Sequence, residues 1–391
     1  MLTLPESNRF HGRLRRCLRR ASAIDNQFSE RPNFNRKGLT LIELLVCVVV
    51  IGILMAVLIP TVMRARETAR RAECLQHLRN LTLAIIQFDQ LHSRLPAAGY
   101  FHDPSDTDGQ APVEPHHSWA VLLLPHIAQQ PLYDRWDLNQ PLDSPDNLPL
   151  ADSYVRVFSC PSDISTGRTG DLSYALNGGW GFTTRTDHNV GDCPVDRSQL
   201  PLDLNGDQSA CSGDSQLDNL DRVRFKQLGL FFVENWKLGQ EVSNRDFTRR
   251  FHSLPDIVDG LTTTMLITEN ARTGFDPDDP LARFANPHPT RTMFFIGNPC
   301  LDGECSDGQV DYSLANAGED RINSGLDQPE GTSTAPNSFH SGGVNMAFAD
   351  GHILFLSEQI TGEVYAALAS PQGQLVRETP LTQTVVSGSE F

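Results

Sequence analysis

The sequence predicts an α+β protein, with one long N-terminal helix followed by a β-rich globular head. No residue from Leu44 to Met63 is charged, and beyond this segment apolar residues recur at helical spacing as far as Phe88. Later in the chain, short runs of β-branched and aromatic residues are separated by Gly, Pro, Asn and Asp, which is the pattern of a half-buried sheet. The 391 residues are enough for such a head to have a core of its own.

Residues 1–38 form a basic leader. They contain nine Lys and Arg against three Asp and Glu, a net charge of +6, whereas the remaining chain carries 23 against 45, a net charge of −22. A basic segment before an apolar helix stays on the cytoplasmic side of a membrane, so we expect a cytoplasmic N-terminus and an exported acidic head. Such a head repels polyanions, and nucleic acid is therefore not an expected partner.

Residues 39–63 are predicted to form a transmembrane helix. At about 1.5 Å rise per residue, the uncharged part of this segment covers the hydrocarbon thickness of roughly 30 Å. Glu43 enters the membrane with the helix, and because an ionised carboxylate there costs about 2.5–3.5 kcal/mol, it needs a partner. If the chain were cut after Gly38, the new amino group of Leu39 would be that partner.

Residues 64–92 are predicted to continue the same helix in amphipathic form. Apolar residues recur there at spacings of three and four, with polar residues between them: Cys74, Leu78, Leu81, Ile85 and Phe88. The helix should end near His92, since Ser93-Arg94-Leu95-Pro96 follows. This outer half is expected to pack against the head.

The head is predicted to comprise residues 93–375, followed by a flexible tail at 376–391. A short helix capped by Ser118 is expected to end at Pro125. Stretches poor in large apolar residues near 185–224 and 298–338, and a similar one at 276–292, predict polar surface insertions. Five segments are predicted to form strands: 155–158, 172–175, 265–268, 293–296 and 344–356.

Six of the eight cysteines are expected in the exported part, and an exported location favours disulfides. The other two, Cys17 and Cys47, lie in the leader and in the membrane helix. Local pairing is the simplest prediction for Cys300 with Cys305 and for Cys193 with Cys211. That would leave Cys74 on the helix to pair with Cys160 on the head, while free buried thiols remain the alternative for each pair.

The pattern of one polar loop predicts a calcium site. Asp203, Asn205, Asp207 and Asp214 occupy positions 1, 3, 5 and 12 of a pattern in which alternate oxygen ligands surround Ca²⁺. Gln208 replaces the glycine expected at the sharp turn, and Asp214 is shorter than the usual bidentate Glu. A solvated acidic loop is the competing interpretation.

The segment from His340 to Gly351 predicts a structural hairpin. Alternate residues after His340 are apolar, and Asp350-Gly351 is a favoured two-residue turn of type I′. The alternative is a metal site in which His340, Asp350 and His352 act as ligands. The hairpin interpretation explains the alternation, and the metal site does not.

The start of the chain resembles the prepilin signal of type IV pilins and type II secretion pseudopilins. The resemblance rests on Arg36-Lys37-Gly38, the first mature residue Leu39 where the family usually has Phe, and Glu43 at the fifth mature position. It implies cleavage after Gly38 by a prepilin peptidase, N-terminal methylation of Leu39, and a role for Glu43 in assembly with other pilin-like subunits. It also implies a bacterial inner-membrane location, with the head exported to the cell surface or a filament.

The head resembles a domain of unknown function that repeatedly follows prepilin-type N-termini and ends in an H-x9-D-G motif. Five segments carry the resemblance: 118–133, 158–163, 173–178, 256–260 and His340-x9-Asp350-Gly351. The resemblance implies architecture and location, and no biochemical activity is established for this family.

The sequence therefore predicts a membrane-anchored, prepilin-like structural protein that joins a pilus-like or type II secretion-like assembly. It contains no nucleophile elbow, zinc-binding H-E-x-x-H, phosphate loop or dinucleotide-binding turn, so an enzyme is not expected. The alternative is a helix-anchored cell-surface binding module that does not polymerise. The two differ in what they need, since assembly requires the Leu39 amine and Glu43, whereas a binding module requires only an apolar anchor.

Overall fold

The computed structural model of the chain describes residues 40–102, 114–164, 169–180, 218–237, 240–242, 252–274, 276, 279–296 and 311–376. The chain consists of two compact units, residues 1–63 and residues 64–391. In the first unit, every described side chain is exposed to the surroundings. The second unit holds both hydrophobic clusters of the molecule's described part.

Helix α2 extends from Leu41 to His92 without interruption and includes Pro60. Among the described helices, it is the one long and apolar enough to cross a membrane. Its end agrees with the prediction, because Ser93 leaves the helix with a φ of 56°. Nine residues of the outer half are buried against the head: Cys74, His77, Leu78, Leu81, Thr82, Ala84, Ile85, Phe88 and Asp89.

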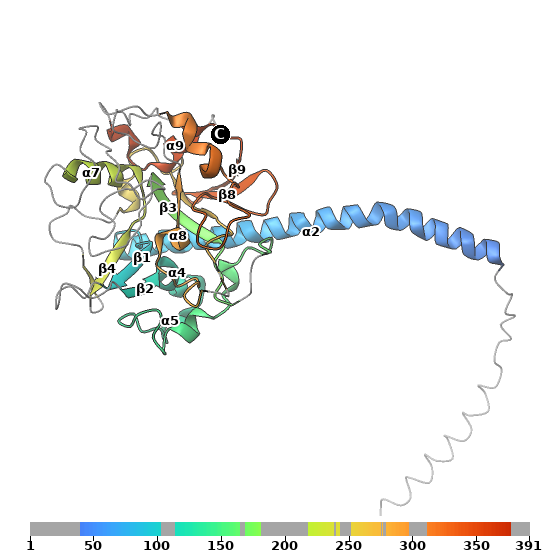
Figure 1. Cartoon of the computed structure of the whole chain (residues 1–391), viewed down its shortest axis with the longest axis horizontal. Helices are drawn as coiled ribbons and strands as arrows, with labels where there is room; N and C mark the ends of the chain where they lie inside the picture. The colour runs from blue at the N-terminus through green and yellow to red at the C-terminus, as the bar shows by residue number, and fades with distance from the viewer. Residues whose placement is uncertain are drawn as a thin grey trace, which may run out of the picture. The chain divides into compact units, whose positions relative to one another are not determined.

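The larger sheet has five strands in the order β7-β3-β6-β8-β9. Neighbouring strands are antiparallel except β3 and β7, which are parallel. The strands are β3 (Tyr174–Trp180), β6 (Met265–Glu269), β7 (Met293–Ile296), β8 (Gly343–Phe348) and β9 (Ile353–Ser357). The predicted strands at 172–175, 265–268, 293–296 and 344–356 all contribute to this sheet (Figure 1).

A smaller sheet, which the sequence did not predict, has four strands in the order β2-β1-β4-β5. The central pair, β1 and β4, is parallel, and the outer pairs are antiparallel. The strands are β1 (Gly99–His102), β2 (Glu114–Ser118), β4 (Val233–Lys237) and β5 (Gln240–Val242). Figure 1 shows β1, β2 and β4 lying together at one side of the head.

Short helices fill the connections. Ser118 caps α4 as predicted, since its hydroxyl accepts a hydrogen bond from the Ala120 amide at 3.2 Å. The described α-helices of the head are α4 (Trp119–Leu123), α5 (Gln130–Tyr133), α6 (Leu148–Ala151), α7 (Asp218–Leu228), α8 (Pro289–Thr292) and α9 (Gly362–Ala369). The described 3₁₀ helices are η1 (Leu124–Ile127), η2 (Arg156–Phe158), η3 (Leu254–Asp256), η6 (Tyr312–Asn316), η7 (Gly318–Asp320) and η8 (Gly373–Leu375).

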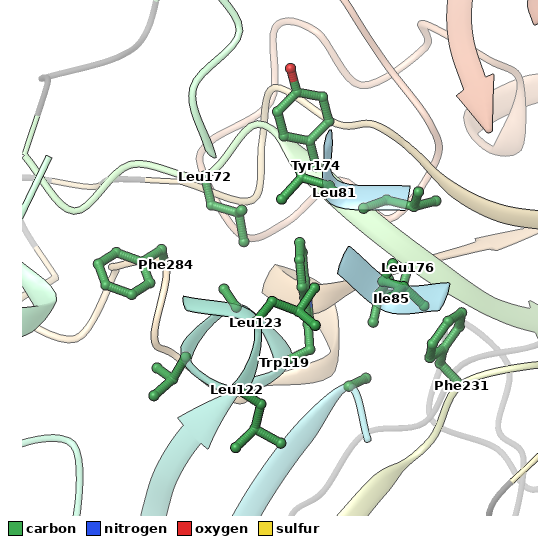
Figure 2. Packing of buried hydrophobic residues seen from close by; sticks show 14 of the residues in the cluster. Leu81, Ile85, Trp119, Leu122, Leu123, Leu172, Tyr174, Leu176, Phe231 and Phe284 are labelled. Carbon is green, nitrogen blue, oxygen red and sulfur yellow. The ribbon is translucent and has the colours of Figure 1, made fainter. Parts of the chain in front are cut away.

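The five-stranded sheet separates the two hydrophobic clusters. Tyr174 and Leu176 of β3 face the cluster that contains the buried stripe of α2, and Ala175 between them faces the cluster that contains α9. Figure 2 shows side chains of α2, α4 and β3 meeting in the first cluster, with Trp119 among them. The outer half of α2 is therefore a core element of the head.

Two local predictions were wrong or incomplete. Residues 155–158 were predicted to form a strand. Instead, residues 156–158 form the 3₁₀ helix η2, and this segment belongs to no sheet among the described residues. The range 298–338, expected as polar surface, contains η6 and η7 in its described part, and Ala315 and Ile322 there are fully buried. Small and isolated apolar residues gave too weak a pattern to reveal this packing.

Candidate functional site

The start of α2 is held by a reciprocal cap. Thr40 donates to the Glu43 carboxylate from its amide at 2.9 Å and from its hydroxyl at 2.8 Å, and its hydroxyl oxygen accepts from the Glu43 amide at 3.3 Å. This is a capping box, in which the side chains at the N-cap and third helical position satisfy each other's free amides. Gly38 and Leu39 lie outside the described residues.

A disulfide joins the outer half of α2 to the head. It links Cys74 with Cys160, which follows η2, with the two Cα atoms 4.9 Å apart. Both residues are almost completely buried. The bond lies within a cluster of polar side chains, which we call the His340 cluster and define as the half-exposed Glu67 and the buried residues Cys74, Cys160, Glu269, His340 and Asn345.

His340 occupies the centre of this cluster. Its Nδ1 lies 3.2 Å from Oε1 of Glu67 on α2, and its Nε2 lies 3.4 Å from Oε1 of Glu269 on β6. The same Nε2 lies 3.8 Å from Sγ of Cys160. The imidazole therefore connects the helix, the sheet and the disulfide.

The two carboxylates favour the charged imidazole. Burial alone lowers the pKa of His340, but the hydrogen bonds and charges of Glu269 and Glu67 outweigh it and raise the pKa above the ordinary value. Partial burial alone raises the pKa of Glu67, but hydrogen bonds from Arg70, His340 and Ser162 hold it below the ordinary value. The result is an ion pair network with a buried centre and a half-exposed outer carboxylate.

Glu269 is held in place by Asn345 on the neighbouring strand β8. The Asn345 amide donates to Oε2 of Glu269 at 2.8 Å, and the Asn345 side chain donates to Oε1 at 2.8 Å. Glu269 is only 1% exposed, and these two bonds compensate for the loss of water around its carboxylate. Its orientation toward His340 is therefore fixed by the sheet.

A second layer of polar contacts positions the loop around Cys160. Ser173 donates to Asp163 at 2.9 Å while its hydroxyl oxygen accepts from the Cys160 amide at 3.1 Å. Ser159 donates to Asp171 at 2.6 Å, and the Tyr174 hydroxyl donates to the Cys74 carbonyl at 3.2 Å. Three of the segments noted in the sequence, 158–163, 173–178 and the one starting at His340, thus meet at the disulfide.

The hairpin after His340 differs from the predicted turn. Strands β8 and β9 are antiparallel, but the connecting residues Ala349, Asp350 and Gly351 form a three-residue turn, in which the Gly351 amide donates to the Phe348 carbonyl. Gly351 alone has a positive φ, 93°, so the type I′ turn was wrong. A three-residue loop with glycine at the left-handed position is the next common hairpin type.

The hairpin also separates the ligands of the alternative metal site. His340 precedes β8 and Asp350 follows it, and Asp350 instead contacts the neighbouring His352. The ligand-type atoms near His340 belong instead to Glu67, Cys74, Cys160 and Glu269. The grouping of His340, Asp350 and His352 was therefore wrong.

The remaining candidate residues lie outside the described part of the chain. These are the calcium-loop residues Asp203, Asn205, Asp207 and Asp214, and the cysteines Cys193, Cys211, Cys300 and Cys305. Cys47 is described and is an exposed free cysteine.

The sequence analysis missed both carboxylates that bind His340. Glu67 belongs to a helical stretch with several charges, and Glu269 ends a strand, so neither position stands out by spacing. Glu269 carried one weak signal, because a charged residue at the end of an apolar strand is unusual unless it is paired. Nothing in the sequence indicated that Glu67 reaches His340, which is 273 positions away.

Two family models match the chain. One, described as a protein of unknown function (DUF1559), matches residues 63–363. The chain belongs to this family. The other, described as a prokaryotic N-terminal methylation motif, matches residues 33–59. No curated protein and no solved structure matches the chain.

Together these matches confirm the predicted combination of a prepilin-type N-terminus with a DUF1559 head. The methylation motif covers Gly38, Leu39 and Glu43, and the head model covers every residue of the His340 cluster. With helix α2, the motif identifies a membrane-anchored, prepilin-like chain.

Proposed function

We propose that this DUF1559 protein is a structural subunit, cleaved after Gly38 by a prepilin peptidase and carried by its mature helix into a pilus-like or pseudopilus-like assembly. In this proposal the N-terminus is cytoplasmic, the helix crosses the bacterial inner membrane, and the acidic head is exported. The partners are the peptidase and other pilin-like subunits. The head then acts as a displayed structural module and has no catalytic role.

The contrast between the two halves of α2 supports this proposal most directly. Residues 41–63 expose their apolar side chains along the whole segment, whereas residues 64–92 bury a continuous stripe in the head. An apolar helix surface of this length is stable only when lipid or neighbouring helices cover it. The prepilin-type motif at its start favours a helix that passes from the membrane into an assembly.

The capping box indicates how cleavage changes Glu43. In the uncut chain the carboxylate is occupied by Thr40, as described above. Cleavage after Gly38 would place a free ammonium group on Leu39, next to Thr40. A charged ammonium is a stronger partner for a carboxylate than a neutral hydroxyl, so processing would release Glu43 for pairing within the mature subunit or between subunits.

Cleavage is tested with Gly38→Arg and a matched glycine control. Gly38→Arg should leave a longer, leader-bearing chain in membranes, because a bulky residue replaces the small one at the scissile bond. Gly52→Ala lies in the same apolar helix, and a methyl group there would meet no atom within 4 Å, so it should be processed normally. N-terminal sequencing of the parent should begin at Leu39, and a mature chain that starts elsewhere would refute the proposal.

Assembly is tested by comparing the two members of the capping box. Thr40→Ala removes the cap but keeps the carboxylate, and such a cap typically contributes about 0.5–2 kcal/mol to helix stability. Glu43→Ala removes the carboxylate, whereas the Thr40 hydroxyl can still accept from the backbone amide of residue 43. We expect cross-linked multimers in membranes to decrease strongly for Glu43→Ala and little for Thr40→Ala. Equal losses would mean that only capping matters, and unchanged multimers in both would favour the anchored binding module.

A further inference from the structure

We propose that the reduced head binds one zinc ion through Cys74, Cys160, His340 and Glu269, and that disulfide formation expels the ion. This inference goes beyond assembly, because it concerns the maturation of the head. It assigns to the His340 cluster a ligand-binding role before the disulfide exists. The same two sulfur atoms would thus hold the helix to the head first through a metal and later through a covalent bond.

The four residues offer one ligand atom each, and these atoms all lie within 4.8 Å of one another. All four residues are buried, so their ligand atoms face each other and not solvent. They come from four separate parts of the described chain: α2, the segment after η2, β6, and the segment before β8. In a tetrahedral site zinc lies about 2.0–2.3 Å from each ligand, so the ligand atoms lie roughly 3.3–3.8 Å apart; the widest separation here would close by about 1 Å, and the two sulfur atoms would move apart once the disulfide is reduced.

The surroundings already orient the ligands in the way that zinc sites require. A metal-binding histidine usually gives its other ring nitrogen to a carboxylate, which fixes the ring. Here Nε2 faces Cys160 and Glu269, and Nδ1 faces the Glu67 carboxylate at 3.2 Å. Glu269 is in turn held by two hydrogen bonds from Asn345.

The ligand types select the metal. Two thiolates, one imidazole and one carboxylate suit zinc, whereas calcium and magnesium prefer sites made of oxygen atoms alone. Two thiolates and one carboxylate also balance the charge of a divalent ion better than a site of neutral ligands would.

The exchange of zinc for the disulfide balances in atoms and electrons. The oxidant is a disulfide donor, RSSR. The two zinc-bound thiolates lose two electrons in total and form the Cys74–Cys160 bond, while the S–S bond of RSSR breaks. Two protons from solvent convert the two RS⁻ products to RSH. Zn²⁺ leaves because the two sulfur atoms are now bonded to each other and no longer act as thiolate ligands.

The test uses the full-length protein, purified in detergent and reduced with an excess of dithiol that is then removed without air. Zinc content is compared with that of Cys74→Ser/Cys160→Ser, which keeps the other six cysteines and any zinc that they bind. We expect the reduced parent to bind one more zinc per chain than this variant. Adding a small-molecule disulfide should release that zinc and yield two more reduced thiols per chain from the parent than from the double-serine variant, which corrects for the other six cysteines.

A second measurement does not depend on the folding of the cysteine variant. Cobalt replaces zinc in the reduced parent, and absorption bands of tetrahedral, thiolate-bound cobalt should appear. They should be lost in His340→Ala and kept in His352→Ala, a control histidine that also contacts a carboxylate but lies at the other end of β8.

Substitution of Glu67, the carboxylate outside the four proposed ligands, should weaken zinc binding without abolishing it. Glu67→Ala should weaken zinc binding about 10–100-fold, because it removes the carboxylate that orients His340. Glu73→Ala is the matched control, since Glu73 also lies on α2 and pairs with an arginine, Arg156, without touching His340. Equal zinc contents in the reduced parent and the double-serine variant, or no thiolate bands with cobalt, would overturn the proposal.

Discussion

His117 on β2 is a buried base that the head keeps uncharged. Complete burial, with a smaller contribution from the neighbouring His116, lowers the pKa of His117 to about 3. Its ring stacks on Tyr100 of β1 with 4.8 Å between ring centroids. A histidine with an unfolded pKa of roughly 6.5 therefore gains a proton on unfolding at any pH between these two values.

We predict that this residue makes the head less stable in acid. Below about pH 6.5 the unfolded state binds one more proton at this position than the folded state, so the free energy of unfolding falls as pH falls. The loss should be about 2 kcal/mol between pH 7 and pH 5, at roughly 1.4 kcal/mol per unit. Denaturant unfolding across this range measures it.

The control for this prediction is His117→Phe, which keeps a ring against Tyr100 but cannot bind a proton. Between pH 7 and pH 5, the free energy of unfolding of this variant should fall by about 2 kcal/mol less than that of the parent. Other histidines with lowered pKa values, including His77 and His252, should retain their contribution in both proteins. An identical pH dependence in the two proteins would contradict the prediction.

At the scale of the element, the outer half of α2 should contribute stability through its buried stripe. Leu81 is fully buried in the cluster shown in Figure 2, whereas Leu83, two positions away on the same helix, is 49% exposed. We predict that Leu81→Ala destabilises the head by about 2–5 kcal/mol. Leu83→Ala should change it by less than about 0.5 kcal/mol. Urea unfolding of both variants tests this, and equal losses would show that the helix does not pack as described.

The elements that could be predicted from the sequence are those with a local signal. The uncharged run of residues 44–63 and the apolar spacing after Cys74 determine one helix. The β-branched runs with turn residues between them indicate all five strands of the larger sheet, with β8 and β9 as one hairpin. The smaller sheet escaped because β2 reads Glu114-Pro115-His116-His117-Ser118, in which polar residues are buried by their neighbours. Tertiary contacts overrode the propensity of these residues.

The candidate site could be predicted only in part, for the same reason. Cys160 and His340 belong to recognisable motifs, and pairing Cys74 with Cys160 was one of the open possibilities. Glu67, Glu269 and Asn345 acquire their roles from the sheet order and from the direction in which α2 crosses the head. A single sequence contains no local pattern that records such distant contacts.

At the scale of the whole molecule, the boundary between residues 63 and 64 should separate anchor from head. Both hydrophobic clusters and the complete His340 cluster lie in the second unit, and the exposed apolar run lies in the first. We predict that a chain starting at Arg64 stays in solution without detergent and unfolds in one cooperative transition. Sedimentation and thermal melting test this, with the full chain as the reference that pellets with membranes. Aggregation, or a transition without cooperativity, would show that the head needs residues 41–63.

The distant contact between Glu67 and His340 has a consequence for the order of export. In the proposed topology the outer half of α2 is exported before the rest of the head, but its buried stripe needs β3, β6 and the residues around His340 to cover it. Since β8 lies between β6 and β9, the sheet remains open until nearly the entire head has crossed the membrane. Contacts of such long range form slowly and leave apolar surface exposed in the meantime. A chain interrupted during translocation would therefore present an uncovered helix next to the bilayer, which makes incomplete subunits distinguishable from finished ones.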